Sequence, residues 1–213
     1  MPAPAIKICG ISTPETLAAV IAARAGFVGF NFHPASPRYV SPSQVQALGA
    51  QAAGRVKRVG LFVDPKHDAL AEAFASGALD ALQLHGAETP ARVADLRARF
   101  GLPVWKVISV ASRADLARAE TYVGAADFVL LDAKTPAAGL PGGMGLKFDW
   151  ALLSGWKAPL PWGLAGGLTP DNVAEAISNT GAPLVDTASG VESSPGVKEP
   201  GLIAAFCQAV RAA

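Results

Sequence analysis

Short apolar runs and amphipathic segments alternate regularly along the chain, and this alternation constrains the fold more than any other feature of the sequence. Eight runs are rich in Val, Leu, Ile or Phe and are bounded by turn residues, which is typical of parallel strands buried on both faces. The expected strands are Ile6–Cys9, Phe27–Phe32, Val59–Val63, Ala81–His85, Val104–Ser109, Phe128–Asp132, Trp162–Ala165 and Leu184–Asp186. The pattern therefore predicts an α/β fold.

Four of the segments between these strands begin with Ser or Thr followed by proline, which is typical of a helix N-terminus. This predicts helices over Pro14–Arg24 and Pro42–Ala53, and helix starts at Thr89-Pro90 and Thr169-Pro170.

Eight strands that alternate with helices in 213 residues predict a (βα)8 TIM barrel, in which residues 1–213 form a single domain. The alternative is a doubly wound open sheet. Against it, the turn Cys9-Gly10-Ile11-Ser12 after the first strand lacks the glycine spacing of a dinucleotide-binding loop.

Composition excludes several classes of protein. With 51% hydrophobic and 16% charged residues, the chain is neither a disordered protein nor a coiled coil. Its 18 Lys and Arg against 17 Asp and Glu give a net charge of +1, which is no electrostatic footprint for nucleic acid or an anionic membrane. A few local donors can still hold a small anionic substrate.

The two cysteines, Cys9 and Cys207, lie at opposite ends of the chain and form neither a secreted disulfide framework nor a zinc site of paired cysteines. The first residues lack the basic and apolar regions of a signal peptide, and no stretch reaches the about 20 apolar residues of a membrane helix. We expect a cytoplasmic monomer with no membrane or nucleic-acid partner.

Reactive side chains end four of the expected strands: Cys9, His85, Asp132 and Asp186. In a barrel these ends form the active-site face. Alternation within Ile6–Cys9 predicts that both isoleucines face the helix layer, whereas Lys7 and Cys9 point into the barrel. Each residue also has an ordinary explanation, since a buried Cys packs as a small apolar residue, Asp caps helices and His bonds to loops.

Two glycine-containing loops follow the last two strands, at Gly166-Gly167 and at Ser189-Gly190. Barrels often bind a phosphate between these loops through backbone N–H groups, and glycine lets the backbone approach the phosphate oxygens. Ordinary turn formation is the alternative. His33 and His67 have no comparable placement and are expected to be surface or loop residues.

The connection from Ala133 to Lys147 is long and rich in glycine. Connections of this length are usually lids, binding loops or disordered segments. Since it begins directly after Asp132, it is expected to cover an active site, with a surface excursion as the alternative.

Seven motifs in the same order and at compatible spacing carry a resemblance to one family. They are Lys7-Ile8-Cys9-Gly10-Ile11, Ser36-Pro37-Arg38-Tyr39-Val40-Ser41-Pro42, Gln83-Leu84-His85-Gly86, Leu130-Leu131-Asp132, Phe148-Asp149-Trp150, Gly166-Gly167-Leu168 with Asn172-Val173, and Ser189-Gly190-Val191-Glu192. Over nearly its whole length the chain resembles phosphoribosylanthranilate isomerase of the tryptophan pathway.

The resemblance implies a (βα)8 barrel without cofactor or metal, acting on a small phosphosugar that carries an anthranilate group. The implied reaction is the Amadori rearrangement of N-(5-phosphoribosyl)anthranilate to 1-(2-carboxyphenylamino)-1-deoxyribulose 5-phosphate. It implies Cys9 as general base and Asp132 as general acid, with Arg38 holding the anthranilate carboxylate. His85 and Asp186 fall on further site positions.

This reaction fits those residue types. Opening the sugar ring needs a proton, which a carboxyl group in an enclosed apolar site can deliver. Removing the hydrogen from C2 needs a base, but a free thiol is mostly protonated at neutral pH. A positive charge must therefore assist Cys9, and Lys7 shares its predicted face. The planar fork of Arg38 suits a carboxylate.

The sequence departs from the family pattern at three positions: Met144 and Ala188 replace residues that are usually hydroxylic, and Glu199 replaces Asp. Backbone phosphate contacts would survive the change at Ala188, and Glu199 is expected to alter only a helix start. Two other functions remain open, namely a related phosphosugar barrel enzyme and a barrel that binds a phosphate ligand without turnover. Only the implied isomerase needs both Cys9 and Asp132.

Overall fold

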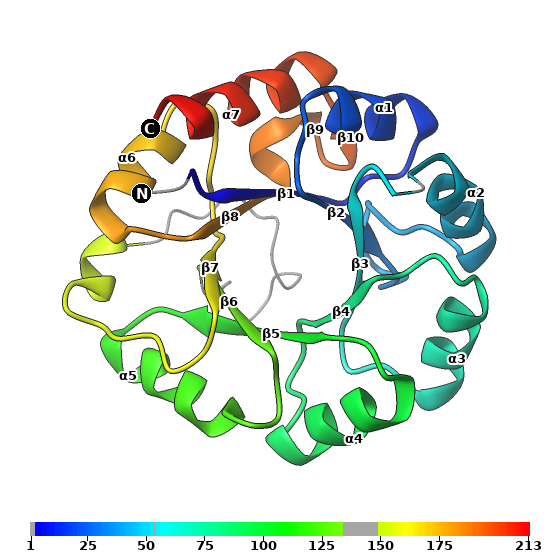
Figure 1. The fold of residues 1–213 in the computed structure, drawn as a ribbon, viewed down its shortest axis with the longest axis horizontal. Coiled ribbons are helices and arrows are strands. Elements are labelled where there is room, and N and C mark those ends of the chain that lie inside the picture. The colour runs from blue at the N-terminus through cyan, green and yellow to red at the C-terminus, as the bar shows by residue number, and fades with distance from the viewer. Residues whose placement is uncertain (1–2, 53, 134–148) are drawn as a thin grey trace.

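The computed structural model describes residues 3–52, 54–133 and 149–213. All eight expected strands form, with ends that differ from the predicted ones by at most two residues, and they close into a parallel barrel in chain order (Figure 1). The strands are β1 (Ala5–Cys9), β2 (Phe27–Asn31), β3 (Lys57–Phe62), β4 (Ala81–Leu84), β5 (Val104–Val110), β6 (Phe128–Ala133), β7 (Trp162–Leu164) and β8 (Leu184–Thr187). The predicted barrel is confirmed.

The first and last strands close the barrel, which excludes the open-sheet alternative. Ala5 of β1 pairs with Leu184 of β8, and Lys7 pairs with Asp186. On its other edge β1 pairs with β2, where Cys9 lies opposite Gly29. Lys7 and Asp186, both singled out in the sequence, are therefore direct neighbours in the sheet.

Helices surround the barrel as an outer ring (Figure 1). They are α1 (Pro14–Ala22), α2 (Pro42–Ala52), α3 (His67–Ala75), α4 (Pro90–Phe100), α5 (Arg113–Leu116), α6 (Val173–Thr180) and α7 (Pro200–Ala212), with 3-10 turns η1 (Ala117–Tyr122), η2 (Trp150–Leu153) and η3 (Ser189–Val191). A short hairpin of β9 (Glu192–Ser194) and β10 (Val197–Lys198) lies between η3 and α7.

Three of the four predicted helix starts are confirmed, and one is wrong. The Thr13 hydroxyl caps α1 and the Thr89 hydroxyl caps α4. By contrast, α6 begins at Val173 rather than at Thr169-Pro170. The side chain of Asn172 accepts a hydrogen bond from the Thr169 amide (2.8 Å) and donates one to the Gly167 carbonyl (2.9 Å), which holds the preceding residues as a loop. The helix predicted over Pro14–Arg24 ends earlier, because Arg24 has a φ of 53°.

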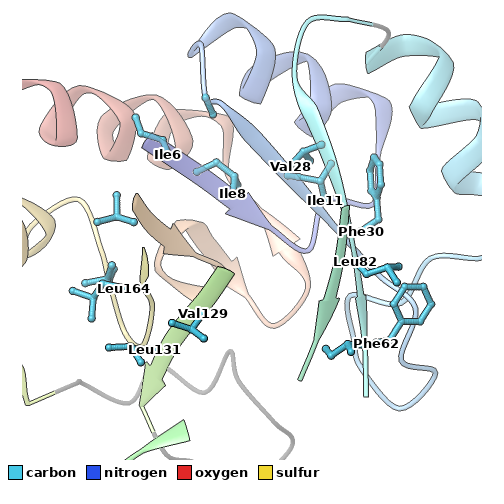
Figure 2. Close-up of a cluster of buried hydrophobic side chains, with 14 of the residues drawn as sticks. Ile6, Ile8, Ile11, Val28, Phe30, Phe62, Leu82, Val129, Leu131 and Leu164 are labelled. Carbon is cyan, nitrogen blue, oxygen red and sulfur yellow. The ribbon is translucent and has the colours of Figure 1, made fainter. Parts of the chain in front are cut away.

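Strand alternation separates two apolar layers. Ile6 and Ile8 point outward into a core between the barrel and the helices (Figure 2), as predicted. A smaller cluster fills the barrel interior: Val59, Ala81, Trp105, Val107, Leu130, Ala165 and Leu184. This inner cluster does not fill the space at the carboxyl ends of the strands, where a cavity remains.

Candidate functional site

A cavity of about 240 Å³ opens at the carboxyl ends of the barrel strands. Among the residues that the sequence singled out, it is lined by Cys9, Arg38, His85, Asp132, Gly166, Gly167, Asp186 and Ser189. These residues come from β1, β6, β8 and the loops after β2, β4, β7 and β8. The barrel thus brings side chains from both ends of the sequence to one hollow.

Cys9 is the last residue of β1 and has a charged pair directly behind it. Lys7, two residues earlier on the same face, is fully buried, and its Nζ lies 3.0 Å from Oδ1 of Asp186. Burial raises the pKa of the Cys9 thiol, although the Lys7 charge works in the opposite direction. The predicted cation beside Cys9 is therefore present, and it also holds a carboxylate.

The charges of this pair depend on each other. Burial alone would lower the pKa of Lys7, but Asp186 and Cys9 raise it on balance, so the ammonium form is maintained. Burial raises the pKa of Asp186, and Lys7 only partly offsets this effect. The result is a protonated lysine held under the thiol by a carboxyl group that takes up a proton more readily than usual.

In the same cavity, Asp132 on β6 lies beside His85, the residue that follows β4. His85 Nε2 is 3.4 Å from Asp132 Oδ2. The other ring nitrogen of His85 and the Oε1 of Gln83 are buried without a hydrogen-bond partner among the described residues. Both residues line the cavity, so its wall contains polar atoms suited to a polar ligand.

The loop after β2 carries Arg38 into the same cavity. Asn31 at the end of β2 organises it, since its amide donates to Ser36 Oγ (3.0 Å) and its oxygen accepts from the His33 amide (2.8 Å). Ser36 Oγ in turn accepts a hydrogen bond from the Arg38 amide (3.2 Å). His33, expected to be a surface or loop residue, lies in this loop and also lines the cavity.

Arg38 belongs to a buried group of three charges. Its Nε and Nη2 donate to the two carboxylate oxygens of Glu192 at 2.7 and 2.6 Å. Lys198 Nζ donates to Glu192 Oε1 at 2.6 Å and to the Ala188 carbonyl at 2.7 Å. Burial would raise the pKa of Glu192, but Arg38 and Lys198 outweigh it and lower that pKa, so the carboxylate stays charged.

The two glycine loops contact each other at the edge of the cavity. Gly166 and Gly167 have φ values of 91° and 66°, which favour glycine. A Cβ on Gly190 would lie 1.9 Å from the Leu168 carbonyl oxygen, so only glycine fits there. Gly166, Gly167 and Ser189 line the cavity, whereas Gly190 supports the loop from behind.

Several predictions concern residues outside this arrangement or outside the described part of the chain. His67 is half-buried at the start of α3, and its ring contacts the Arg92 guanidinium (2.6 Å) away from the cavity. Of the predicted lid, Ala133–Lys147, the first residue ends β6, and residues 134–147, including Met144, lie outside the described residues. Glu199 stands at the start of α7 without a side-chain capping bond, in line with the minor role expected of it.

The sequence prediction missed His33, Glu192 and Lys198. Glu192 ends the last resembling motif, so its place in that motif is the signal that could have identified it. Among the described residues, no group of three or more His, Cys, Asp or Glu is placed to hold a metal ion. No helix in the same ranges is long and apolar enough to cross a membrane.

Comparisons with known proteins agree with one another. A family model described as N-(5'phosphoribosyl)anthranilate (PRA) isomerase matches residues 6–209. The N-(5'-phosphoribosyl)anthranilate isomerase of Paracoccus denitrificans is 54% identical over 202 residues, covering 94% of each chain. That of Zymomonas mobilis is 50% identical over 206 residues, covering 96% of this chain and 97% of the relative.

Solved structures show the same similarity. Phosphoribosyl anthranilate isomerase from Thermotoga maritima matches with a TM-score of 0.88 and 33% identity, covering 99% of this chain and 100% of that one. A second matching structure, with a TM-score of 0.85 and 31% identity over the same shares, is a phosphoribosyl anthranilate isomerase in complex with reduced 1-(o-carboxyphenylamino)-1-deoxyribulose 5-phosphate.

Proposed function

Since the chain belongs to the N-(5'-phosphoribosyl)anthranilate isomerase family, whose members are isomerases of tryptophan biosynthesis, we propose that Cys9 is its general base and Asp132 its general acid. The substrate would be N-(5-phosphoribosyl)anthranilate and the reaction its Amadori rearrangement. The observation that carries this proposal is that a thiol on β1 and a carboxyl group on β6 line one cavity large enough for a sugar between them.

In the first step Asp132 donates a proton to the ring oxygen of the ribose. The bond between C1 and the ring oxygen breaks, the oxygen becomes the hydroxyl group of C4, and the anthranilate nitrogen forms an iminium ion with C1. His85, 3.4 Å from the Asp132 carboxyl group, is the neighbour that we assign to orient this acid. A positioned acid of this kind contributes about 10²–10⁴-fold to a rate.

In the second step Cys9 removes the proton from C2. The electron pair of the C2–H bond forms the C1=C2 double bond, and the iminium nitrogen receives the electrons of its own double bond. The resulting enolamine becomes the ketone when C1 gains a proton and the C2 hydroxyl group loses one. Atoms and electrons therefore balance without a cofactor.

Two positive charges favour the thiolate form of Cys9. Lys7 is fixed beneath it by Asp186, and the iminium ion of the opened substrate adds a second charge only after the first step. Because burial raises the pKa of the free thiol, deprotonation would follow ring opening rather than precede it. The order of the two steps thus follows from electrostatics.

The two ends of the substrate would bind away from the reacting carbons. Arg38 suits the anthranilate carboxylate, since a guanidinium group binds planar anions through parallel hydrogen bonds. The backbone around Gly166, Gly167 and Ser189-Gly190 would hold the phosphate, where glycine removes side chains from the approach. Such remote contacts supply binding energy for orientation.

The test is turnover of freshly generated phosphoribosylanthranilate, followed by its fluorescence. Cys9→Ala and Asp132→Asn should each lower kcat by about 10²–10⁴-fold while the substrate affinity changes little. Cys207→Ala and Asp68→Asn are matched controls, since Cys207 is buried in α7 and Asp68 is exposed on α3. Retained turnover in both site variants would contradict the assigned roles.

A further inference from the structure

Arg38, which lines the cavity, forms a buried cluster with Glu192 and Lys198, two charged residues that have no role in the proposed reaction. The side chains of Arg38 and Glu192 are 9% and 3% exposed, and that of Lys198 is 1% exposed. Glu192 is bound on both oxygens, with Arg38 across its whole carboxylate and Lys198 on Oε1. Two cations around one anion leave the cluster with a single positive charge.

A buried carboxylate at this place needs an explanation. The substrate carries a carboxylate and a phosphate, so a nearby Glu repels it and weakens the attraction of Arg38. Buried ion pairs are also poor evidence for a stabilising role, because desolvation offsets much of their attraction. What a pairing through two parallel hydrogen bonds does provide is a fixed plane for the guanidinium group.

We propose that Glu192 is a positioning residue that orients Arg38 toward the aromatic carboxylate of the substrate, with Lys198 as the counter-charge that allows a carboxylate to be buried there. The inference rests on the proposed function, because it takes Arg38 as the group that binds this carboxylate. Glu192 and Lys198 would then set specificity for a substrate whose aromatic ring carries a carboxylate over a substrate whose ring lacks it.

The surrounding backbone supports this role. The β9–β10 hairpin that carries Glu192 and Lys198 packs on the loop of Arg38, since a Cβ on Gly196 would lie 2.6 Å from the Pro37 carbonyl oxygen. Lys198 also donates to the carbonyl of Ala188, the residue before Ser189. The cluster therefore joins the proposed carboxylate site to the proposed phosphate loop and sets the spacing between the two ends of the substrate.

The competing explanation is that the cluster only stabilises the fold. The two explanations differ in how the binding of two ligands responds to a mutation. One ligand is reduced 1-(o-carboxyphenylamino)-1-deoxyribulose 5-phosphate, and the other is the same compound without the ring carboxylate. A structural defect weakens both ligands equally, whereas loss of Arg38 orientation weakens only the first.

The experiment measures both dissociation constants for the wild type and for Glu192→Gln. We expect the preference for the carboxylated ligand to fall by about 10- to 100-fold, the range for a lost hydrogen-bonded charge contact. In turnover, KM should rise more than kcat falls. Glu199→Gln is the matched control, because Glu199 lies beside the same hairpin and makes no side-chain capping bond. Its ligand preference should equal that of the wild type.

Glu192→Gln leaves Arg38 and Lys198 close together as two buried cations, so a second variant guards against misfolding. Glu192→Gln with Lys198→Met keeps the single positive charge of the cluster without the clamp on Arg38. We expect this double variant to fold, to bind the ligand without the carboxylate like the wild type, and to lose the same preference. Full preference in a folded double variant would overturn the inference.

The outcomes also separate this inference from the proposed function. If the wild type does not prefer the carboxylated ligand, Arg38 does not bind the carboxylate and the assignment of the substrate-binding residues fails. If the wild type has the preference and both Glu192 variants keep it, the substrate site stands and Glu192 is not its positioning residue.

Discussion

Two fully buried lysines lie on opposite faces of the barrel wall, and their surroundings differ. Lys7 on β1 points into the barrel, below Cys9, with Asp186 as its carboxylate partner. Lys106 on β5 points away from the barrel interior, because its neighbours Trp105 and Val107 fill that interior. Each has a carboxylate at 3.0 Å, so distance to a counter-ion does not distinguish them.

Their remaining contacts do distinguish them. Lys106 Nζ donates to the carbonyls of Leu84 and Gly86 and to Glu88, and Glu88 also accepts from two backbone amides. Burial lowers the pKa of Lys106 despite Glu88, whereas the pKa of Lys7 is raised. One buried charge therefore fixes a loop through backbone contacts, whereas the other supplies charge to the neighbouring Cys9 thiol.

The largest expected effect is on stability, from Lys106→Met. It leaves Glu88 buried without its cation and two carbonyls without their donor, so the free energy of unfolding should fall by about 4 kcal/mol. The kcat of the folded variant should stay within about threefold of the wild type, a change worth under 1 kcal/mol. Urea unfolding and fluorescence turnover measure the two quantities. A large loss of kcat would instead show that Lys106 acts on the site through His85.

For Lys7→Met we expect a large loss of kcat and a smaller loss of stability. Loss of the cation removes the charge that lowers the pKa of Cys9, so this pKa should rise and kcat should fall by about 100-fold. Stability should change less than in Lys106→Met, because Asp186 can take up a proton. The rate of thiol alkylation against pH reports the pKa of Cys9. The exposed Lys57→Met is the control, and an unchanged alkylation profile in Lys7→Met would refute the assigned effect.

A third buried group, Cys207 in α7, does not line the cavity, and the Arg211 charge only partly offsets the effect of burial on its pKa. Burial raises its pKa to about 11 from the ordinary 9.0, so the unfolded thiol ionises before the folded one. Stability should therefore fall as pH rises, by about 1.4 kcal/mol between pH 8 and pH 10 from this group. The measurement is urea unfolding at both pH values, and Cys207→Ala should lose that part of the slope. An identical slope in the variant would show that Cys207 is not the cause.

The smallest expected effect is on stability, from the loss of a hydrogen bond in the Lys106 region. The Tyr122 hydroxyl donates to the Glu88 carbonyl at 2.8 Å, so Tyr122→Phe should cost about 1 kcal/mol of unfolding free energy with kcat unchanged. Urea unfolding beside Lys106→Met tests whether both belong to one cluster. In the double variant, the loss of unfolding free energy should be smaller than the sum of the losses in the two single variants.

The sequence allowed prediction of those parts of the fold that depend on local patterns. Alternation in Ile6–Cys9 predicts which side chains face the helices, because a strand places successive side chains on opposite faces. The start of α6 was predicted wrongly, since the side chain of Asn172 bonds to the Thr169 amide and the Gly167 carbonyl and holds these residues as a loop. The local preference of Thr169-Pro170 for a helix start is overridden by these hydrogen bonds of the loop beside the cavity.

Within the site, the strand-end residues and the glycine loops were predictable, whereas His33, Glu192 and Lys198 were not. His33 reaches the cavity through a turn held by Asn31 and Ser36, which no periodic pattern indicates. Glu192 and Arg38 are 154 positions apart in the sequence, so their contact depends on how the hairpin packs on a distant loop. Contacts of this kind follow from tertiary structure alone.

Closure of the barrel by its first and last strands has a consequence for synthesis. Lys7 and Asp186 are 179 positions apart, although they are neighbours in the sheet. A ribosome releases the amino-terminal strand first, and contacts between distant positions form slowly. A nascent chain therefore carries Cys9 without the aspartate behind it until β8 has been translated. A fragment that stops before β8 should keep Cys9 and Lys7 but lack the Asp186 carboxylate that fixes the Lys7 ammonium group, so the charge arrangement behind the thiol depends on translation through β8.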